Sequence, residues 1–235
     1  MTRTDYLMCR NLCADTGQEA PEEGVRFYRA AGFPDEQLEL YRTRFGGFGK
    51  GVYRLPNSYR RIEEGERIAI GNRLWEIVIG RGHAPEHACL WCREDNIMIS
   101  GDQLLPRISS NVSVFPTEPE GNPLQDWIDS CEKLKGLLPA DIFVLPAHNE
   151  PFRGAHTRLK ELIDGHESGM DKLADMCREP KRAVDVFPAL FRAKITSGNY
   201  GMATGESLAH LNCLRKRGRM ARDTDGKGVQ WYQTV

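Results

Sequence analysis

Two histidines and one aspartate stand at positions where the chain could build a metal site. His83, Asp102 and His148 each follow an apolar, strand-like run, and they lie 19 and 46 residues apart. Neutral imidazole and carboxylate are ligands that zinc accepts. Strands of one sheet can bring such distant positions to a common edge, where sites of α/β proteins usually form. A carboxylate between two histidines can bridge two metal ions, so this pattern predicts a hydrolytic metal centre.

The segments around these residues predict the elements that must position them. Residues 59–100 are typical of β-structure, with strands expected at 61–63, 67–70, 74–79, 88–92 and 97–99. A helix is expected over 123–137, followed by an apolar strand over 141–145 that ends just before His148. A strand, a helix and another strand in this order favour an α/β layer architecture.

The first 50 residues have a different pattern. Residues 4–47 show the apolar spacing of three helices, which we interpret as a helical insertion in a first domain, 1–154, whose β-rich part is 59–154. The glycine-rich segment 46–51 invites a phosphate-loop interpretation. No strand precedes it, however, and no Ser or Thr follows Lys50, so we interpret it as a flexible connector.

The last 80 residues predict a second domain, 155–235. Three helices are expected, followed by a β-hairpin, which is the outline of a winged helix-turn-helix; the elements are 155–179, 183–191, 202–217, 219–222 and 229–234. The run 214–222 carries five positive charges and no negative ones, so it could contact nucleic-acid phosphates. The alternative is a solvated helix end, where cations are favoured anyway.

Composition excludes several classes of protein. A chain of 235 residues can form one large or two small domains. No apolar run approaches the roughly 18 residues that a membrane span requires, and the first residues lack the apolar part of a signal peptide. The seven cysteines have no framework spacing, which favours reduced thiols and a cytoplasmic location. A net charge of −1 selects no particular partner.

Three short segments carry a family resemblance. Residues 82–87 (Gly-His-Ala-Pro-Glu-His), 100–102 (Ser-Gly-Asp) and 147–151 (Ala-His-Asn-Glu-Pro) resemble, in order, three motifs of the metallo-β-lactamase superfamily. The resemblance is strong over about 60–155, and the tail resembles the winged-helix tail of a subgroup. It implies an αββα sandwich, two zinc ions and hydrolysis of an ester, thioester, amide or phosphodiester. It also implies that His83 ligates one zinc, that His148 ligates the other, and that Asp102 bridges them as the catalytic carboxylate.

The chain departs from this family in one large respect. The motif His-x-His-x-Asp-His is absent, since no two of the six histidines (83, 87, 148, 156, 166 and 210) are separated by a single residue. Three ligands remain for two metal positions, whereas one zinc usually needs three. We therefore expect an incomplete sandwich without its N-terminal strands, with doubtful zinc occupancy. A truncated gene product is favoured over an inactive relative, because the surviving ligands have not drifted.

Smaller departures concern glycine positions of the family motifs. Ala147, Asn149 and Glu86 replace glycines. If a residue beside His148 needs a positive φ, Asn suits that conformation better than Ala.

Further residues have two interpretations each. His87 either orients His83 from outside the ligand set or caps the next strand. Arg107 and Asn111 either face a substrate, where Arg107 could hold a carboxylate or phosphate, or belong to the surface. Cys89 and Cys92 have the spacing of a redox or zinc motif, but within a strand they are expected to be partly buried packing residues.

These observations predict a metal-dependent hydrolase of a small ester or thioester, with zinc as cofactor, in which the chain alone is inactive if truncated. The competing hypothesis is a non-catalytic module whose winged helix contacts nucleic acid or a protein partner. We expect a small-molecule substrate, no membrane partner, and self-association, because half a sandwich leaves sheet edges and apolar faces unpaired.

Overall fold

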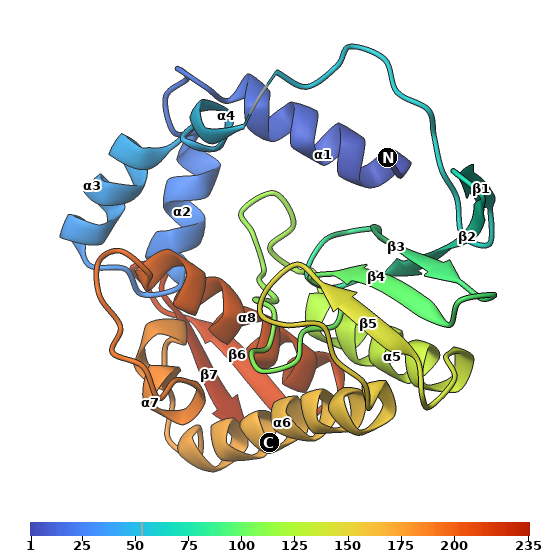
Figure 1. The fold of residues 1–235 in the computed structure, drawn as a ribbon. Coiled ribbons are helices and arrows are strands. Elements are labelled where there is room, and N and C mark those ends of the chain that lie inside the picture. Colours follow the sequence, from blue (N-terminus) through green and yellow to red (C-terminus); the bar gives the residue numbers. More distant parts are fainter. Residues whose placement is uncertain (53) are drawn as a thin grey trace. The chain divides into compact units, whose positions relative to one another are not determined.

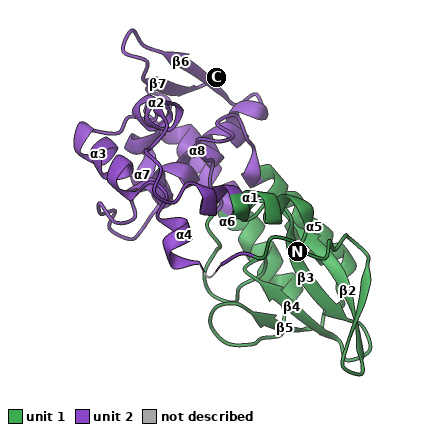
Figure 2. Cartoon of the chain, turned by 90° about the horizontal axis from the view of Figure 1, so that it is seen from above, with its two compact units in different colours: residues 1–10, 56–111, 125–165 green, residues 11–55, 112–124, 166–235 purple. Residues whose placement is uncertain are grey.

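The computed structural model describes residues 1–52 and 54–235 (Figure 1). They form two compact units, coloured separately in Figure 2. Unit 1 comprises residues 1–10, 56–111 and 125–165, and unit 2 comprises residues 11–55, 112–124 and 166–235. Three helices contain residues of both units: α1 (Arg3–Ala14), α5 (Pro123–Leu137) and α6 (Ala155–Met176).

Unit 1 is built on a five-stranded sheet. Its strands lie in the order in which they occur in the chain: β1 (Arg67–Ile70), β2 (Arg73–Gly80), β3 (His87–Cys92), β4 (Ile97–Gly101) and β5 (Phe143–Pro146). Neighbours from β1 to β4 pair antiparallel, whereas β5 pairs parallel to β4. The parallel pair needs a long crossover, which contains α5 (Pro123–Leu137). The predicted α/β layer arrangement is confirmed.

A helix covers one face of the sheet. Figure 1 places α5 along it, and two contacts fix that helix to the end of β2: Ser130 accepts a hydrogen bond from the Arg81 N–H at 2.9 Å, and Lys133 donates one to the carbonyl of Ile79. On β4, Met98 is fully buried while its neighbour Ile99 is 39% exposed. The described strands of unit 1 all belong to this one sheet, and the αββα sandwich and the self-association stay predictions.

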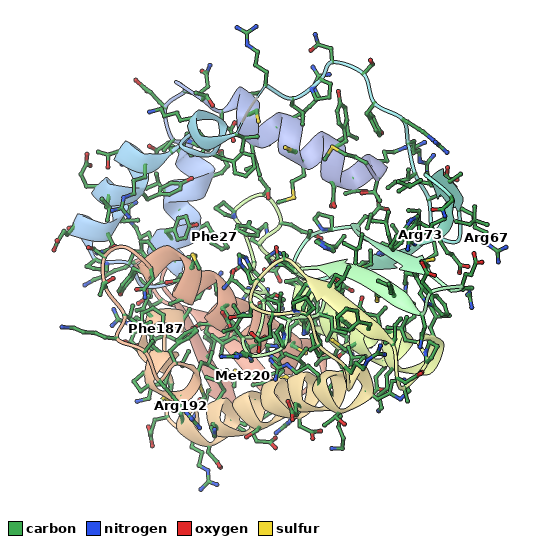
Figure 3. The ribbon with its side chains drawn as sticks, in the orientation of Figure 1. Phe27, Arg67, Arg73, Phe187, Arg192 and Met220 are labelled. Carbon is green, nitrogen blue, oxygen red and sulfur yellow. The ribbon has the colours of Figure 1, made fainter. Side chains whose placement is uncertain are left out.

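Ion pairs connect the first strands of the sheet to their neighbours. Arg67, the one charged residue of the edge strand β1, pairs with Glu76 of β2 at 3.5 Å. Arg73, the first residue of β2, pairs with Asp95 of the β3–β4 turn; Figure 3 labels both arginines.

Two local predictions for the first hundred residues were wrong. Residues 61–63 form no strand; the chain turns at Gly65 (φ 76°), whose N–H donates to the carbonyl of Ile77. The charged residues around that glycine favour a solvated turn over a strand. The segment 46–51 is more than a connector, since Phe48–Gly51 closes one helical turn, α4.

Unit 2 joins residues 11–55, near the N-terminus, to the C-terminal part of the chain. Val25 of α2 (Glu22–Ala30), Leu38 of α3 (Asp35–Arg44) and Phe33 of the turn between them form a buried apolar cluster. Val184 and Tyr200 pack against it. The predicted domain division, which joins residues 4–47 to the first domain, 1–154, stays a prediction. The amphipathic pattern predicts that these helices bury a face, but it does not say against which distant segment.

The remaining elements of unit 2 lie close to their predicted places. They are η1 (Ala183–Val186), α7 (Phe187–Leu190), α8 (Tyr200–Lys216), β6 (Met220–Thr224) and β7 (Gln230–Thr234). β6 and β7 form an antiparallel hairpin in which Arg222 lies opposite Tyr232. Asp225 closes its turn by accepting hydrogen bonds from the N–H groups of Lys227 and Val229. The winged-helix interpretation of this set stays a prediction.

Among the described residues, none of the helices combines the length and the apolar character needed to cross a lipid bilayer.

Candidate metal centre

The end of β4 positions the carboxylate. Gly101 adopts φ 53° at an irregularity in the β4–β5 register, and a Cβ there would lie only 2.2 Å from Nε2 of His87. Only glycine combines this left-handed backbone with so close an approach. Its carbonyl accepts a hydrogen bond from the N–H of Ala147 at 3.0 Å. The turn that presents Asp102 is thereby tied to the segment that presents His148.

The three predicted ligands converge in unit 1. Nε2 of His83 lies 3.6 Å from Oδ2 of Asp102, and Nε2 of His148 lies 3.4 Å from Oδ1 of the same carboxylate. Two imidazoles from separate loops therefore face the two oxygens of one carboxylate. This is the side-chain arrangement that the bridging role requires, although the roles themselves stay predictions.

A hydrogen bond fixes the tautomer of His83. Its Nδ1 lies 2.8 Å from the backbone carbonyl of Asn111, which can only accept, so Nδ1 carries the proton. In the neutral ring, Nε2 then presents its lone pair to Asp102. Two electron-rich atoms facing each other are stabilised by a cation between them. Asn111 thus contributes its carbonyl to the site, whereas the sequence predicted either a residue facing substrate or a surface residue.

The donor types and spacing fit zinc, but the number of donors is low. Two ligands bound at about 2.0–2.1 Å to one tetrahedral zinc lie roughly 3.3 Å apart, close to the two observed separations. Each position nevertheless has only one imidazole and one carboxylate oxygen. Within residues 1–52 and 54–235, no cluster of three or more His, Cys, Asp or Glu side chains is placed to hold one metal ion. The residues present therefore fit part of each coordination shell.

His87 packs beside the candidate ligands. It opens β3 opposite Gly80, and its ring lies 6.3 Å from that of His83, measured between centroids. Burial, and after it the neighbouring His83, lower the pKa of His87 below its ordinary value. The ring is therefore neutral near pH 7 and fills the space over Gly101. This geometry accommodates both predicted roles, packing at the strand start and support of the ligand loop.

Arg107 has an acidic partner that its sequence neighbourhood does not indicate. Its Nε lies 2.8 Å from Oε1 of Glu150, which comes two residues after His148. This ion pair joins the loop after Asp102 to the loop after His148, and its hydrogen bond to Arg107 lowers the pKa of Glu150. Because its charge is compensated, Arg107 is less available to hold a substrate carboxylate or phosphate than predicted. The only sign of this ion pair in the sequence is the glutamate itself, within the segment 147–151.

The loop after β5 explains one replacement of a family glycine. Asn149 adopts φ 66°, whereas Ala147 is not among the described residues with positive φ. Asparagine tolerates this left-handed conformation better than alanine does. Asn149, which has the left-handed conformation, is therefore of a residue type that tolerates it.

Cys89 and Cys92 are packing residues. Both thiols are free and fully buried, and their spacing along β3 places them on opposite faces of the sheet. Burial raises the pKa of Cys89 to about 12, so it is not a thiolate near neutral pH. This geometry supports the packing interpretation over a redox or zinc motif.

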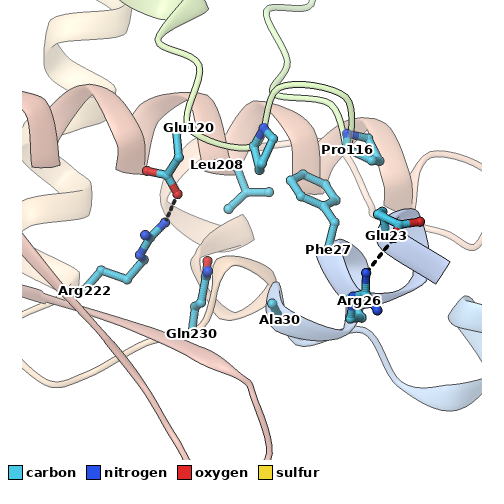
Figure 4. A pocket seen from close by; sticks show the side chains of 10 residues that line it. Glu23, Arg26, Phe27, Ala30, Pro116, Glu120, Leu208, Arg222 and Gln230 are labelled. Atoms are coloured by element: carbon cyan, nitrogen blue, oxygen red, sulfur yellow. Dashed lines mark hydrogen bonds and ion pairs between the residues drawn. The ribbon is translucent and has the colours of Figure 1, made fainter. Parts of the chain in front are cut away.

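Unit 2 contains a separate hollow of about 360 Å³ (Figure 4). Phe27 and Leu208 form part of its apolar lining, and its charged side chains are already paired. Arg26 binds Glu23 at 2.7 Å, and Arg222 binds Glu120 at 2.8 Å. The charges of this hollow compensate one another and select no charged ligand.

Most cations of the basic run in the tail are ion-paired within unit 2. Four of its five cations have an acidic partner outside the run; the pairs are Arg215 and Arg222 with Glu120, Arg217 with Glu167, and Arg219 with Asp171. Phosphate binding requires cations that are free to replace counterions. These arginines instead connect helices and loops of their own unit.

The metallo-beta-lactamase superfamily model matches residues 20–148, more than half of the chain. A second model, the metallo-beta-lactamase-like C-terminal domain, matches residues 170–235. The chain therefore belongs to the metallo-beta-lactamase superfamily and carries its C-terminal domain. The two matched ranges lie on either side of residue 154, although the domain boundary itself stays a prediction.

Similar proteins include one solved structure that matches throughout. The crystal structure of a beta-lactamase domain protein from Burkholderia ambifaria is 34% identical, with a TM-score of 0.89 over 100% of this chain and 65% of that chain. Hydroxyacylglutathione hydrolase from Rhodospirillum rubrum is 32% identical over 102 residues, 43% of this chain and 37% of that protein. Acyl-coenzyme A thioesterase MBLAC2 from Gallus gallus is 30% identical over 95 residues, 40% of this chain and 32% of that protein. The chain thus matches about a third of the length of these two enzymes.

Proposed function

We propose that His83, Asp102 and His148 belong to the active site of a metal-dependent hydrolase that cleaves a small thioester or ester. The observation that carries this proposal is the pair of imidazole Nε2 atoms facing the two oxygens of one carboxylate at 3.4 and 3.6 Å. The names of two relatives, a hydroxyacylglutathione hydrolase and an acyl-coenzyme A thioesterase, both describe cleavage of a thioester. They support a thioester as the substrate class.

Each residue of the cluster has a defined task in this proposal. His83 and Oδ2 of Asp102 would hold one zinc, and His148 and Oδ1 would hold the other. Bound zinc supplies a Lewis acid and lowers the pKa of a coordinated water to about 7. The Asn111 carbonyl keeps the proton of His83 on Nδ1, so that Nε2 stays a ligand.

Two contacts join the loops that carry the proposed ligands. The hydrogen bond from Ala147 to Gly101 and the ion pair of Arg107 with Glu150 join the two loops that carry Asp102 and His148. Because a bridging carboxylate must keep both oxygens aimed at separate partners, relative movement of these loops would separate the two metal positions. The connections between the loops therefore support a site with fixed geometry.

The alternative is a non-catalytic module that binds nucleic acid through residues 155–235. Its main support is the basic run 214–222. Four of these five cations are ion-paired with three acids, which lowers the positive charge available for phosphates. The hydrolase proposal accounts for more of the geometry.

The test measures zinc content and thioester hydrolysis in the natural gene product, with an acyl-glutathione and an acyl-coenzyme A as substrates. Asp102→Asn should lower kcat/KM at least about 100-fold, because an amide cannot replace an anionic ligand to two metals. Asp129→Asn is the matched control, since Asp129 is exposed on α5, outside the ligand loops. A zinc-loaded protein that cleaves neither class of thioester nor a simple ester would contradict the proposal.

A further inference from the structure

Glu86 connects the ligand loop of unit 1 to the first turn of α1. Its carboxylate Oε2 accepts a hydrogen bond from the backbone N–H of Thr4 at 3.0 Å. Its own N–H donates to Oδ1 of Asp5 at 2.9 Å, and its carbonyl accepts from the Thr2 hydroxyl at 3.0 Å. Three contacts thus join one residue of the loop to residues 2–5.

The contacts have the reciprocal form of a helix cap. The first N–H groups of an α-helix have no partner inside the helix, and a carboxylate is a favourable acceptor for them. Here that acceptor comes from a segment more than 80 residues away, and an acidic side chain of the first turn returns a hydrogen bond to it. In a capping box, both partners belong to one short segment. The same exchange between distant segments fixes their relative position.

Glu86 lies where a shift of the backbone would reach the candidate ligands. It is three residues after His83 and directly before His87, whose ring covers Gly101. The loop leaves the sheet at Gly80 and returns at His87, which are paired with each other. Between these two fixed ends, Glu86 is a point at which the loop is bound to another element.

We propose that Glu86 is a positioning residue, which anchors the loop 82–87 on the first turn of α1 and so keeps Nε2 of His83 aimed at Asp102. The consequence for zinc binding rests on the proposed function, whereas the orientation of His83 does not. The replacement of a family glycine by Glu86 is then compensated by a contact that glycine cannot make.

The orientation of His83 can be followed by the ¹⁵N chemical shifts of its ring at pH 8, which distinguish the Nδ1–H from the Nε2–H tautomer. The native chain should show the Nδ1–H form, which donates to Asn111. Glu86→Ala and Thr4→Pro each remove the contact, the second from the helix side, where proline is tolerated because it lies in the first turn. Both should give a mixture of tautomers and faster amide exchange of residues 82–87.

Two further variants separate positioning from general stabilisation. Glu86→Gln keeps an acceptor oxygen and should restore the native His83 signal. Glu36→Ala removes an exposed acid from the first turn of α3 and should leave the signal unchanged. A native His83 signal in both Glu86→Ala and Thr4→Pro overturns the proposal, even if the amides of α1 exchange faster.

Zinc affinity gives the second readout, measured by competition with a chromophoric chelator. Loss of a group that orients a ligand typically weakens binding about 10- to 100-fold, and we expect the lower end of this range for Glu86→Ala. A native chain without measurable zinc binding contradicts the proposed function alone, because the ring signals still decide the role of Glu86. If the His83 signal changes while zinc affinity stays the same, Glu86 positions the loop without affecting metal binding. That result overturns the proposed consequence for zinc binding.

Discussion

The two units each contain a pair of histidines, and the surroundings of the two pairs differ. In unit 1, His83 and His148 have side chains that are 31% and 62% exposed, and a carboxylate lies between them. In unit 2, His166 and His210 are only 6% and 2% exposed, and their rings contact each other directly, with Nδ1 of His166 3.2 Å from Nε2 of His210. The same residue type therefore serves as a candidate ligand in one unit and as a packing residue in the other.

Hydrogen bonding decides the state of the buried pair. Nδ1 of His210 lies 2.8 Å from the carbonyl of Glu206, so it donates, and Nε2 is left to accept from Nδ1–H of His166. Burial lowers the pKa of His166 to about 3, with a smaller contribution from His210, and it lowers the pKa of His210 to about 4. Both rings are neutral near pH 7. Exposure together with an acidic partner, rather than the pairing of imidazoles, distinguishes a site that can take up a cation.

The largest expected effect of the buried histidine pair is on the free energy of unfolding at acidic pH. In the unfolded chain an imidazole binds a proton near pH 6.5, whereas the buried rings stay neutral until about pH 4. Between these values the unfolded state binds more protons. The free energy of unfolding should therefore fall with falling pH, by up to about 1.4 kcal/mol per pH unit for each histidine.

Urea unfolding at a series of pH values measures this slope. His210→Asn keeps a donor for the Glu206 carbonyl and removes one titrating group, so its slope between pH 6 and pH 4 should be smaller than that of the native chain by up to about 1.4 kcal/mol per pH unit. Parallel slopes for the two proteins would show that the acid sensitivity has another source.

A substitution of each type of histidine should separate the two regions next. His210→Ala leaves a cavity and removes the hydrogen bond between the two buried rings, so the free energy of unfolding should fall by about 3 kcal/mol. His148→Ala alters an exposed loop side chain and should change it by less than about 0.5 kcal/mol. Thermal or urea unfolding at pH 7.5 measures both, and similar losses for the two variants would contradict the distinction.

The sequence predicted much of the candidate site because its signals are local. Each proposed ligand follows an apolar strand, and the irregular turn at Gly101 was marked by its Gly-Asp sequence. The helix over 123–137 was predicted within its observed bounds, because its apolar spacing is regular. Where a periodic pattern and a turn signal agree, the sequence alone is sufficient.

The incorrect or missing parts depend on partners far away in the chain. Glu86 and Glu150 are surface-type residues whose roles come from Thr4 and Arg107, 82 and 43 residues away. The arginines of the run 214–222 are similarly defined by acids elsewhere in unit 2. The union of residues 11–55 with the C-terminal helices likewise has no local signal. Charge and amphipathicity show that a side chain needs a partner, but they do not identify it.

Metal affinity tests the exposed cluster more finely. His83→Ala and His148→Ala each remove one ligand from one position, whereas Asp102→Asn affects both. We therefore expect each histidine variant to weaken zinc binding at one position at least about tenfold, and Asp102→Asn to weaken it at both. A zinc titration followed by calorimetry separates these outcomes. His210→Asn is the control from unit 2. A loss of zinc binding in that variant would contradict the assignment of zinc binding to the exposed cluster alone.

The smallest effect concerns the backbone beside His148. Asn149 (φ 66°) and Asn96 (φ 53°) are the described non-glycine residues with positive φ, one next to a candidate ligand and the other in the β3–β4 turn. Alanine in a left-handed conformation costs about 1 kcal/mol more than asparagine or glycine, so Asn149→Ala and Asn96→Ala should destabilise the fold similarly, while Asn149→Gly should be nearly neutral. Only Asn149→Ala should also alter the ring signals of His148, because its backbone can escape the strain by moving the neighbouring ligand. If Asn96→Ala disturbed His148 equally, the loop after β5 would have no special part in holding the site.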